Sequence, residues 1–469
     1  PYRATLFFDQ GYMLIEVLTD ELVHVEYGAG QGPGPNPQIY ASPMVRPQSY
    51  PGPRMLSFDG AKVLQTEALR LEMDGYGCVA VTDRAEDEYR TKICPVRLRD
   101  PQKGLSIDPS RMRNAYGLGQ YFRKLGTANG DWVEHGGFAT DGEYGNHFRD
   151  FWGGANGQIQ FPMLYAAGEG NDCFGLFLDN VYKQDWDFQS DSWWQMRTSG
   201  DQLRFYLVGG RDLAAVRSNY MDLVGRPLVP PRKAFGMWVS EFGFDNWEEI
   251  DGKLSVMRKG GFPIDGFALD VQWFGGAQEN SPDSAMGGLA WDPVNFPDVR
   301  DRLRAYTEDH IGFINIEESY VSRNQPSYGE MDTRGGLVRH CEKDTPVDFV
   351  AWMGDTGMID WSNAEAAAWW HDNLRQPNII DLGVVAHWTD LGEPERFDPA
   401  GCYQGVEPWK TRHADIHNIF NLLWHRSIYE GYQRNHASSN QRPFMLSRAG
   451  APGIQRFGAG MWSGDIASR

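Results

Sequence analysis

The sequence predicts an N-terminal antiparallel β-sandwich followed by a TIM-type (β/α)8 barrel. Three observations lead to this fold class. Short β-type runs separated by turn signals fill the chain before residue 230. Strand-like and helix-like stretches alternate after that point, which is the pattern of parallel strands joined by crossover helices. Polar residues close the later strand-like runs, as they do at the functional face of a barrel.

The first part of the chain, residues 1–228, reads as all-β. Its clearest β-type runs are residues 13–27, 68–73, 173–180 and 203–210. Gly and Pro punctuate the intervals, and they predict loops at 30–37 and 49–53. Short strands at this spacing indicate an antiparallel sandwich. The prolines of RPLVPPRKA (226–234) then place a domain boundary, after which residues 229–469 form the second domain.

The second part alternates strands and helices. Its strand-like runs are residues 234–240, 264–271, 311–318, 384–390 and 442–448. Its amphipathic helical stretches are residues 247–260, 298–310, 363–376 and 413–433. This order predicts parallel strands with crossover helices. A (β/α) barrel is the leading interpretation, and an open doubly wound sheet is the alternative.

The ends of these strand-like runs carry polar side chains, which are Glu241, Asp270, Glu317, Asp390 and Arg448. A barrel would gather such residues at its functional face, so the set as a whole favours a catalytic interpretation. Single members have structural alternatives. Asp270 suits a helix cap, and Glu317 or Glu318 suits a structural ion pair.

Composition limits the partners. A net charge of −19 argues against nucleic acid or an anionic membrane as the main partner, because both need concentrated Lys and Arg. Aromatic residues make up 13% of the chain, with 17 Trp, and flat rings pack well against sugars. Large β-rich domains also bury many aromatic residues. Composition alone therefore leaves the carbohydrate interpretation open.

The five cysteines are odd in number and widely scattered, and none forms a CxxC pair. This pattern predicts neither a disulfide framework nor a zinc site. It favours a reducing compartment such as the cytoplasm over a secreted or periplasmic location. No apolar stretch reaches transmembrane length.

Two motifs carry the chemistry, HWTDLGEPERF (387–397) and SRAGAPGIQRFGAGMWSGDIASR (447–469). Breaking an acetal needs one carboxylate to attack or shield the developing cation and a second carboxyl group to protonate the departing oxygen. Asp390 follows a largely apolar strand-like run, beside Trp388. Asp465 follows Trp462 and two small residues. These two acids are the candidate catalytic pair.

The motifs resemble those of glycoside hydrolase family 31. Residues 388–393, WTDLGE, fit the family's nucleophile motif WxDMNE except for Gly392 at the Asn position. Arg456-Phe457 and the WSGD of 462–465 match the acid/base motif RYxxxWxGD, with Phe for Tyr. Arg448 corresponds to the upstream arginine of that block. YGLGQ (116–120), residues 174–180 and Asp270 extend the resemblance over nearly the whole chain.

The resemblance implies a retaining α-glycosidase that works by double displacement, with Asp390 as the nucleophile and Asp465 as the acid and then base. It implies that Asp270, Arg448, Trp388, Trp462 and Glu393 bind an α-linked glucoside or oligosaccharide, and that no metal or organic cofactor is needed. Glu241 stands where many α-glucosidases have an arginine, so it too is a candidate substrate contact.

Three function classes stay open. The first is hydrolysis, and the second is transfer by an oligosaccharide 4-α-glucosyltransferase, a branch that the LGEPE loop resembles. The third is carbohydrate binding without catalysis. The family continues beyond the position of Arg469, so the resemblance implies a partial chain whose barrel lacks its last strands. Residues 144–154 are expected to add a loop to the pocket, and His413 and His417 to pack or cap a helix.

Overall fold

The structure is a computed structural model. It describes residues 2–30, 42–119, 139–144, 161–182, 184–188, 190, 192–200, 202–276, 284–351, 353–406, 411–435, 442–462 and 464. The chain forms two compact units, Pro1–Arg226 with Ala451–Gly453 and Pro227–Gly450 with Ile454–Arg469.

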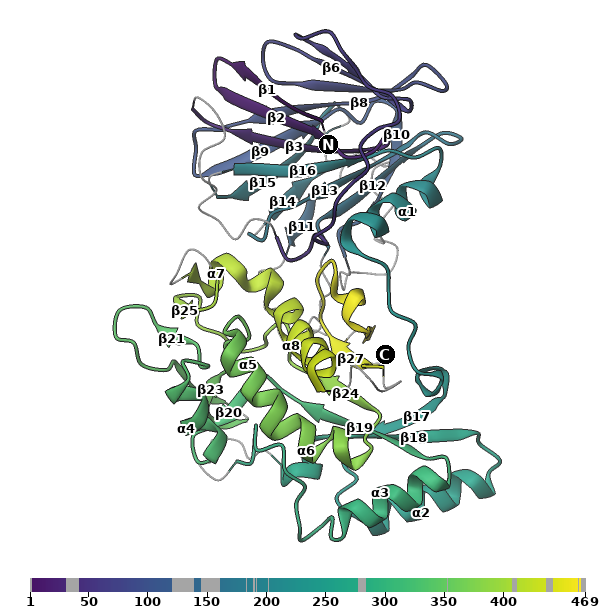
Figure 1. The fold of residues 1–469 in the computed structure, drawn as a ribbon, viewed down its shortest axis with the longest axis vertical. Coiled ribbons are helices and arrows are strands. Elements are labelled where there is room, and N and C mark those ends of the chain that lie inside the picture. Colours follow the sequence, from purple (N-terminus) through teal and green to yellow (C-terminus); the bar gives the residue numbers. More distant parts are fainter. Residues whose placement is uncertain are drawn as a thin grey trace. The chain divides into compact units, whose positions relative to one another are not determined.

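Two antiparallel sheets build the first unit (Figure 1). The seven-stranded sheet contains, in spatial order, β1 Tyr2–Phe8, β2 Gly11–Val17, β3 Leu22–Gly28, β16 Gln202–Val208, β13 Cys173–Leu178, β12 Met163–Gly168 and β10 Met112–Gly117. The nine-stranded sheet contains β11 Ala139–Tyr144, β14 Gln184–Asp187, β15 Trp194–Ser199, β9 Gln102–Ile107, β8 Glu88–Val96, β7 Val79–Asp83, β6 Leu69–Met73, β5 Val63–Gln65 and β4 Ser57–Phe58. Helix α1, Leu213–Val224, packs against β13.

One hydrophobic core joins the two sheets, which makes the unit a sandwich. Ile15 and Leu176 of the seven-stranded sheet belong to the same buried cluster as Leu71 and Leu105 of the nine-stranded sheet. Alternate residues along β6 are buried, as a strand with one face on a core requires. The structure thus confirms the predicted sandwich and the strands within residues 68–73, 173–180 and 203–210.

The predicted run 13–27 is two strands rather than one. β2 ends at Val17 and β3 begins at Leu22, and the two pair as an antiparallel hairpin. The Thr19 hydroxyl accepts hydrogen bonds from the backbone N–H groups of Glu21 and Leu22, at 3.2 and 3.0 Å, and so closes the turn. Thr and Asp favour such turns because their side chains bond nearby backbone groups.

The prediction that the cysteines form no disulfides is wrong. Cys78 pairs with Cys94, and Cys341 pairs with Cys402. The strand registers explain both pairs, because Val79 lies opposite Ile93, and Arg339 lies opposite Cys402. Pairing of strands from distant parts of the chain brings these thiols together, which spacing in the sequence does not show. The cysteines therefore no longer favour a reducing compartment, since disulfides persist mainly under oxidising conditions.

The second unit is built on a parallel sheet whose spatial order follows the chain. Its strands are β17 Met237–Glu241, β18 Ile264–Leu269, β19 Gly312–Glu317, β24 Ala386–Thr389, β27 Met445–Arg448 and β28 Ala459–Trp462. The order does not reverse at any point along these six strands, as it would in a doubly wound sheet. The structure confirms the five predicted parallel strands and adds β28, and the arrangement is that of part of a barrel.

Helices cross between the strands in all four predicted stretches (Figure 1). They are α2 Trp247–Lys259, α3 Val299–Glu308, α5 Ala364–Trp370, η4 His371–Arg375, α7 His413–Ile416, η6 His417–Ile419 and α8 Phe420–Asn435. Three short segments, η3 Val271–Phe274, α6 Gln376–Asn378 and η5 Ile380–Leu382, lie outside or run beyond those stretches. Side-chain caps fix the start of α2. The Asn246 side chain accepts a hydrogen bond from the N–H of Glu249, and the Glu249 carboxylate accepts one from the N–H of Asp245.

The segments that follow β19 and β24 are longer than the other connections of the sheet. Two small antiparallel sheets lie there, made of β20 Tyr320–Ser322, β22 Asp348–Ala351 and β23 Gly354–Met358, and of β21 Arg339–His340, β25 Gly401–Tyr403 and β26 Thr411–Arg412. Short helical turns complete the unit, which are η2 Arg232–Phe235, α4 Pro326–Thr333 and η7 Ile454–Phe457.

Alternation along the strands gives the parallel sheet two faces. On the helix face, Phe313 packs on Trp247 of α2, and Thr389 hydrogen-bonds His425 of α8. The opposite face, called the inner face here, begins with a small buried cluster of Ala268, Ile314 and Ala386. Successive side chains of a strand point to opposite faces, so even-numbered positions of β18, β19 and β24 belong to the inner face.

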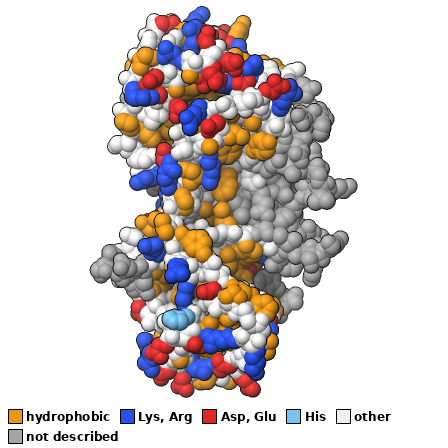
Figure 2. Space-filling view, turned by 90° about the vertical axis from the view of Figure 1, so that its right-hand side faces the viewer, with side chains coloured by type: hydrophobic (Ala, Val, Ile, Leu, Met, Phe, Trp, Pro, Cys, Tyr) orange, Lys and Arg blue, Asp and Glu red, His pale blue; other side chains and the backbone are white. Residues whose placement is uncertain are grey.

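On the molecular face drawn in Figure 2, acidic and basic side chains of the described residues are interspersed rather than gathered by sign. None of the described helices has both the length and the apolar character that a membrane crossing requires.

Candidate active site

Neighbouring strands bring charged residues together at their carboxyl ends. The register pairs Glu317 of β19 with Thr389 of β24, and the N–H of Asp390 donates to the Glu317 carbonyl oxygen at 3.2 Å. Glu318 and Asp390, which directly follow these strands, are therefore neighbours. Arg448 ends the next strand, β27. This is the edge at which a barrel builds its functional site.

Arg448 is the cation of this cluster. Its Nε and Nη2 atoms donate to the two carboxylate oxygens of Glu393, at 2.8 and 3.0 Å, and Nη2 also donates to Glu395 at 2.8 Å. Nε lies 3.3 Å from Oδ1 of Asp390. Burial opposes the charge on Arg448, but the surrounding carboxylates hold its pKa well above the ordinary value, so the guanidinium stays charged.

Asp390 has a strongly shifted pKa. Burial raises it to about 7, because the charged form loses hydration, while the Arg448 guanidinium opposes the rise. The negative charges of Glu393 and Asp270 also raise the pKa of Asp390. Strongly perturbed carboxyl groups in this position are typical of functional sites.

Glu318 is a further acid in the same cluster. Its side chain is buried, and Oε2 has no hydrogen-bond partner among the described residues. Burial raises its pKa well above the ordinary value, and the charges of Asp390 and Asp270 add to this effect. Burial and the neighbouring negative charges therefore favour the neutral form of the Glu318 carboxyl group.

The loop after Asp390 is held by a close approach of three segments. Leu391 adopts a left-handed backbone conformation, with φ of 54°. A side chain at Gly392 would bring its Cβ within 2.4 Å of Asn421 Nδ2 and 2.8 Å of the Arg448 carbonyl oxygen. A side chain at this position would therefore force the backbone to move, and glycine avoids this.

Polar contacts on the helix face support the strand that precedes Asp390. Nδ1 of His425 lies 2.8 Å from the carbonyl oxygen of Asn421, so this nitrogen carries the proton. Nε2 then accepts from the Thr389 hydroxyl, at 2.9 Å. Asn421 and His425 are not among the site residues predicted from the sequence. They are four positions apart, which places both on one face of a helix, and this spacing is the feature of the sequence that could have indicated that they act together.

Glu317, the last residue of β19, takes part in a structural ion pair. Nε of Arg375 lies 2.9 and 2.8 Å from its two carboxylate oxygens, and both side chains are buried. This matches the structural alternative weighed for Glu317. Asp270 also acts as a cap, because its side chain accepts from the N–H of Val271 at 2.7 Å.

Aromatic side chains lie beside Asp390. The rings of Trp388 and Trp462 meet edge to face, with centroids 5.9 Å apart. Both side chains are half-buried. The candidate acid Asp465 and Gln120 lie outside the described residues, as does the candidate pocket loop 144–154 apart from its first residue, which ends β11.

The structure does not bring Glu241 into this cluster. Its carboxylate pairs with Lys253 of α2, with Nζ 3.0 Å from Oε2. The register places Glu241 opposite Leu269, at an odd-numbered position of the sheet. Its side chain therefore belongs to the helix face, whereas Asp390 belongs to the inner face.

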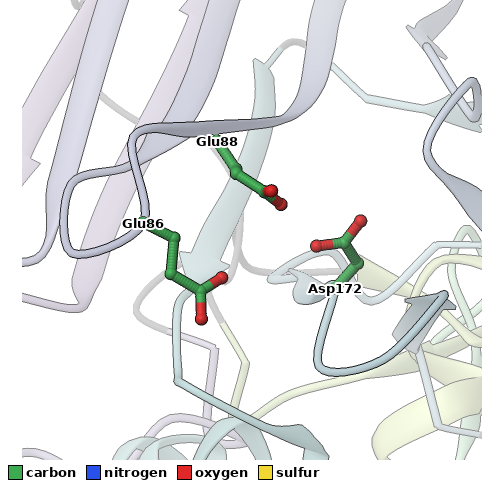
Figure 3. Close-up of side chains that lie close together, drawn as sticks. All are labelled: Glu86, Glu88 and Asp172. Carbon is green, nitrogen blue, oxygen red and sulfur yellow. The ribbon is translucent and has the colours of Figure 1, made fainter.

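Two other groups resemble metal sites. In the first unit, the carboxylates of Glu86, Glu88 and Asp172 lie close together (Figure 3). Arg90 forms ion pairs with all three, and Arg111 forms ion pairs with Glu88 and Asp172. These cations already supply the positive charge, so the cluster is an ion-pair network.

In the second unit, Nε2 of His413 lies 2.7 Å from Nδ1 of His417. The pair is buried, and His413 stacks on Phe397 with ring centroids 4.6 Å apart. Burial lowers the pKa of His417 to about 4 and that of His413 well below its ordinary value, so both rings are neutral and pack as aromatic groups.

Comparisons with known proteins show what the chain is similar to. A family model described as the glycosyl hydrolases family 31 TIM-barrel domain matches residues 227–469. The chain is 25% identical over 313 residues to alpha-glucosidase 2 of Bacillus thermoamyloliquefaciens, covering 65% of this chain and 38% of that protein. It is 26% identical over 340 residues to alpha-xylosidase XylQ of Lactiplantibacillus pentosus, covering 71% and 40%. The chain thus spans less than half the length of these relatives.

Solved structures share the fold. A family 31 dextranase of Flavobacterium johnsoniae, complexed with isomaltotriose, superposes with a TM-score of 0.80 over 99% of this chain and 56% of that one, at 19% identity. A family 31 alpha-xylosidase from a soil metagenome, complexed with xylose, gives a TM-score of 0.79 over 100% and 67%, at 16% identity. Both structures therefore superpose on this chain over nearly its whole length.

Proposed function

The chain belongs to glycosyl hydrolase family 31, and from this premise we propose that it is part of a retaining α-glycosidase with Asp390 as the nucleophile and Asp465 as the acid/base. The observation that carries the proposal is the contact of Asp390 with the buried cation Arg448, at the carboxyl ends of adjacent parallel strands. Residues 229–469 would form the catalytic domain and residues 1–228 the sandwich domain.

In the first step of the proposed reaction, a carboxylate oxygen of Asp390 attacks the anomeric carbon of the bound sugar. The bond from that carbon to the leaving oxygen breaks, and Asp465 gives its proton to this oxygen. The product is a covalent glycosyl-enzyme. Arg448 favours the ionised form of Asp390, which the attack requires, against the effect of burial.

In the second step, water attacks the same carbon and gives a proton to Asp465, while the bond to Asp390 breaks. Two inversions restore the original anomeric configuration. Retention needs the two carboxyl groups about 5–5.5 Å apart. The chemistry needs no metal ion and no organic cofactor.

Other residues of the cluster have proposed supporting roles. Asp270 would contact sugar hydroxyls, and Trp388 and Trp462 would form an aromatic wall against the sugar ring. Glu393 would act mainly through Arg448, since both of its carboxylate oxygens accept hydrogen bonds from that guanidinium. The substrate would be an α-linked glucoside or oligosaccharide, although relatives named for glucose and for xylose are equally similar.

The test is incubation of the full-length protein with maltotriose and with 4-nitrophenyl α-glucoside and α-xyloside, with products analysed by mass. Asp390→Ala should abolish turnover. Glu308→Ala, an acid exposed at the end of α3, serves as the matched control and should leave turnover unchanged. Turnover that persists in Asp390→Ala would overturn the assignment of the nucleophile.

Transfer to a second sugar is the alternative outcome, because it uses the same glycosyl-enzyme. Oligosaccharides longer than maltotriose, absent with Asp390→Ala, would show an α-glucosyltransferase. Glucose and maltose alone would show a hydrolase. No turnover of any α-glycoside by the unaltered protein would favour a carbohydrate-binding relative.

A further inference from the structure

Glu318 occupies the middle strand of the three that carry the acids of the site. β19 lies between β18 and β24, and it pairs with both in parallel. Asp270 follows β18 and Asp390 follows β24, so Glu318 stands between them at the same edge. A sugar that contacts both aspartates must pass over the end of β19.

The direction of the Glu318 side chain follows from its neighbour in the chain. Glu317 points to the helix face, where it binds Arg375. Side chains alternate, so Glu318 points to the inner face, together with Asp390. Its electrostatic neighbours agree, since Asp390, Asp270 and Arg448 are among the charges that act on it.

The Glu318 carboxyl group is incompletely satisfied within the protein. Oε2 is buried and has no hydrogen-bond partner among the described residues. A buried polar atom left without a partner costs about 1–3 kcal/mol. Glu317, one residue earlier, has its charge fully paired. The Glu318 carboxyl group lies beside the candidate nucleophile Asp390. A bound ligand could therefore supply the hydrogen-bond partner that Oε2 lacks among the described residues.

We propose that Glu318 is a specificity-determining residue, whose carboxyl group hydrogen-bonds one hydroxyl group of the sugar held between Asp270 and Asp390. This inference rests on the proposed glycosidase function. Burial favours the neutral form of this group, and in that form its O–H can donate to the sugar hydroxyl while its carbonyl oxygen accepts. A site that hydrogen-bonds a substrate hydroxyl rejects the analogue that lacks it, because its own polar group is then left without a partner.

The experiment compares the full-length protein with Glu318→Gln and Glu318→Leu on 4-nitrophenyl α-glycosides and on their 2-, 3-, 4- and 6-deoxy analogues. Glu318→Leu should lower kcat/KM about 10- to 100-fold on the parent sugar, which corresponds to the loss of one buried hydrogen bond. On the one analogue that lacks the contacted hydroxyl, the same variant should differ from the unaltered protein by no more than about twofold. Glu318→Gln keeps the shape and both hydrogen-bonding functions, so it should stay within a few fold.

Unfolding experiments separate this role from a structural one. Leucine at 318 removes a buried carboxyl group that has no partner on Oε2, so its melting temperature should equal or exceed that of the unaltered protein. Glu308→Leu is the control for removal of an exposed acid. A melting temperature that falls in both Glu318 variants, with equal losses on every deoxy analogue, would overturn the proposal.

The outcomes also distinguish failure of the role proposed for Glu318 from failure of the proposed glycosidase function. If the unaltered protein turns over α-glycosides and Glu318→Leu retains the parent kcat/KM, the role of Glu318 is refuted and the proposed function stands. If the unaltered protein turns over no α-glycoside, the proposed function fails, and the inference that rests on it fails as well.

Discussion

The Nε atom of Arg448 lies 3.3 Å from Oδ1 of Asp390, although 58 positions separate the two residues in the chain. Parallel pairing of β24 with β27 produces this contact, since Thr389 lies opposite Ser447 and the next residues on each strand are Asp390 and Arg448. The guanidinium also binds two glutamates of the loop that follows Asp390. One buried cation therefore organises both the candidate nucleophile and its loop.

Replacing Arg448 by methionine should weaken both stability and activity. The change leaves Asp390, Glu393 and Glu395 without their cation, and removing one partner of a buried ion pair costs about 3–5 kcal/mol. Denaturant titration should show this loss in the free energy of unfolding. Arg300→Met, at an exposed position of α3, should change it by less than about 0.5 kcal/mol. Equal stability of the two variants would contradict the role given to Arg448.

Activity should rise with pH as Asp390 loses its proton. The nucleophile must be ionised, and the pKa of Asp390 is about 7, so kcat/KM should increase through an acid limb centred near pH 7. The charge of Glu393 raises this pKa. Glu393→Gln should therefore move the acid limb to lower pH. A limb that stays in place, or moves upward, would contradict the electrostatic assignment.

Asparagine at position 390 should abolish turnover and stabilise the fold in a pH-dependent way. Burial raises the pKa of Asp390 in the folded protein from 3.8 to about 7, so the folded state resists ionisation. The unaltered protein accordingly loses stability as the pH rises from about 4 to about 7. Asp390→Asn removes that loss, which amounts to about 2–4 kcal/mol.

The comparison of the two proteins is a set of unfolding curves at several pH values. The difference in their free energies of unfolding should be small at pH 4, grow up to pH 7 and stay constant above it. A difference that is independent of pH would show that Asp390 ionises as freely in the folded state as in the unfolded chain.

Gly392→Asn should be destabilising, even though asparagine is the residue of the family motif at this position. Its Cβ would lie 2.4 Å from Asn421 Nδ2 and 2.8 Å from the Arg448 carbonyl oxygen, so the backbone must move. Overpacking of this kind costs about 1–3 kcal/mol. Gly252→Asn, where a Cβ meets open space, is a control for the loss of glycine. Thermal unfolding of both variants measures the difference.

Opening the disulfide between Cys341 and Cys402 should also destabilise the second unit. The two residues are 61 positions apart, and releasing a loop of that length costs about 4 kcal/mol in the chain-entropy description. A Cys341→Ser, Cys402→Ser double variant should unfold at lower denaturant concentration than the unaltered protein under non-reducing conditions. A reducing agent should shrink this difference. If it does not, the two thiols are unlinked.

Particular residues show how far the sequence predicts the site. Asp390 and Arg448 each close an apolar strand-like run, which predicts a place in the site, and the structure brings them into contact. The same rule predicts Glu241, but Glu241 lies on the helix face with Lys253. Glu317 closes its strand as well and binds Arg375, whereas the next residue, Glu318, joins the cluster of acids.

Apolar runs and amphipathic spacing are local properties of the chain, so the strands, the crossover helices and the acids that close the strands can be predicted from the sequence alone. The side of the sheet that each side chain takes depends on the tertiary structure. The parallel strand β19 is buried along its whole length, on both faces, so its sequence has no alternation of buried and exposed residues that would show which face each side chain takes. A shift of one residue moves a carboxyl group from the helix face to the inner face, and strand pairing alone sets that position.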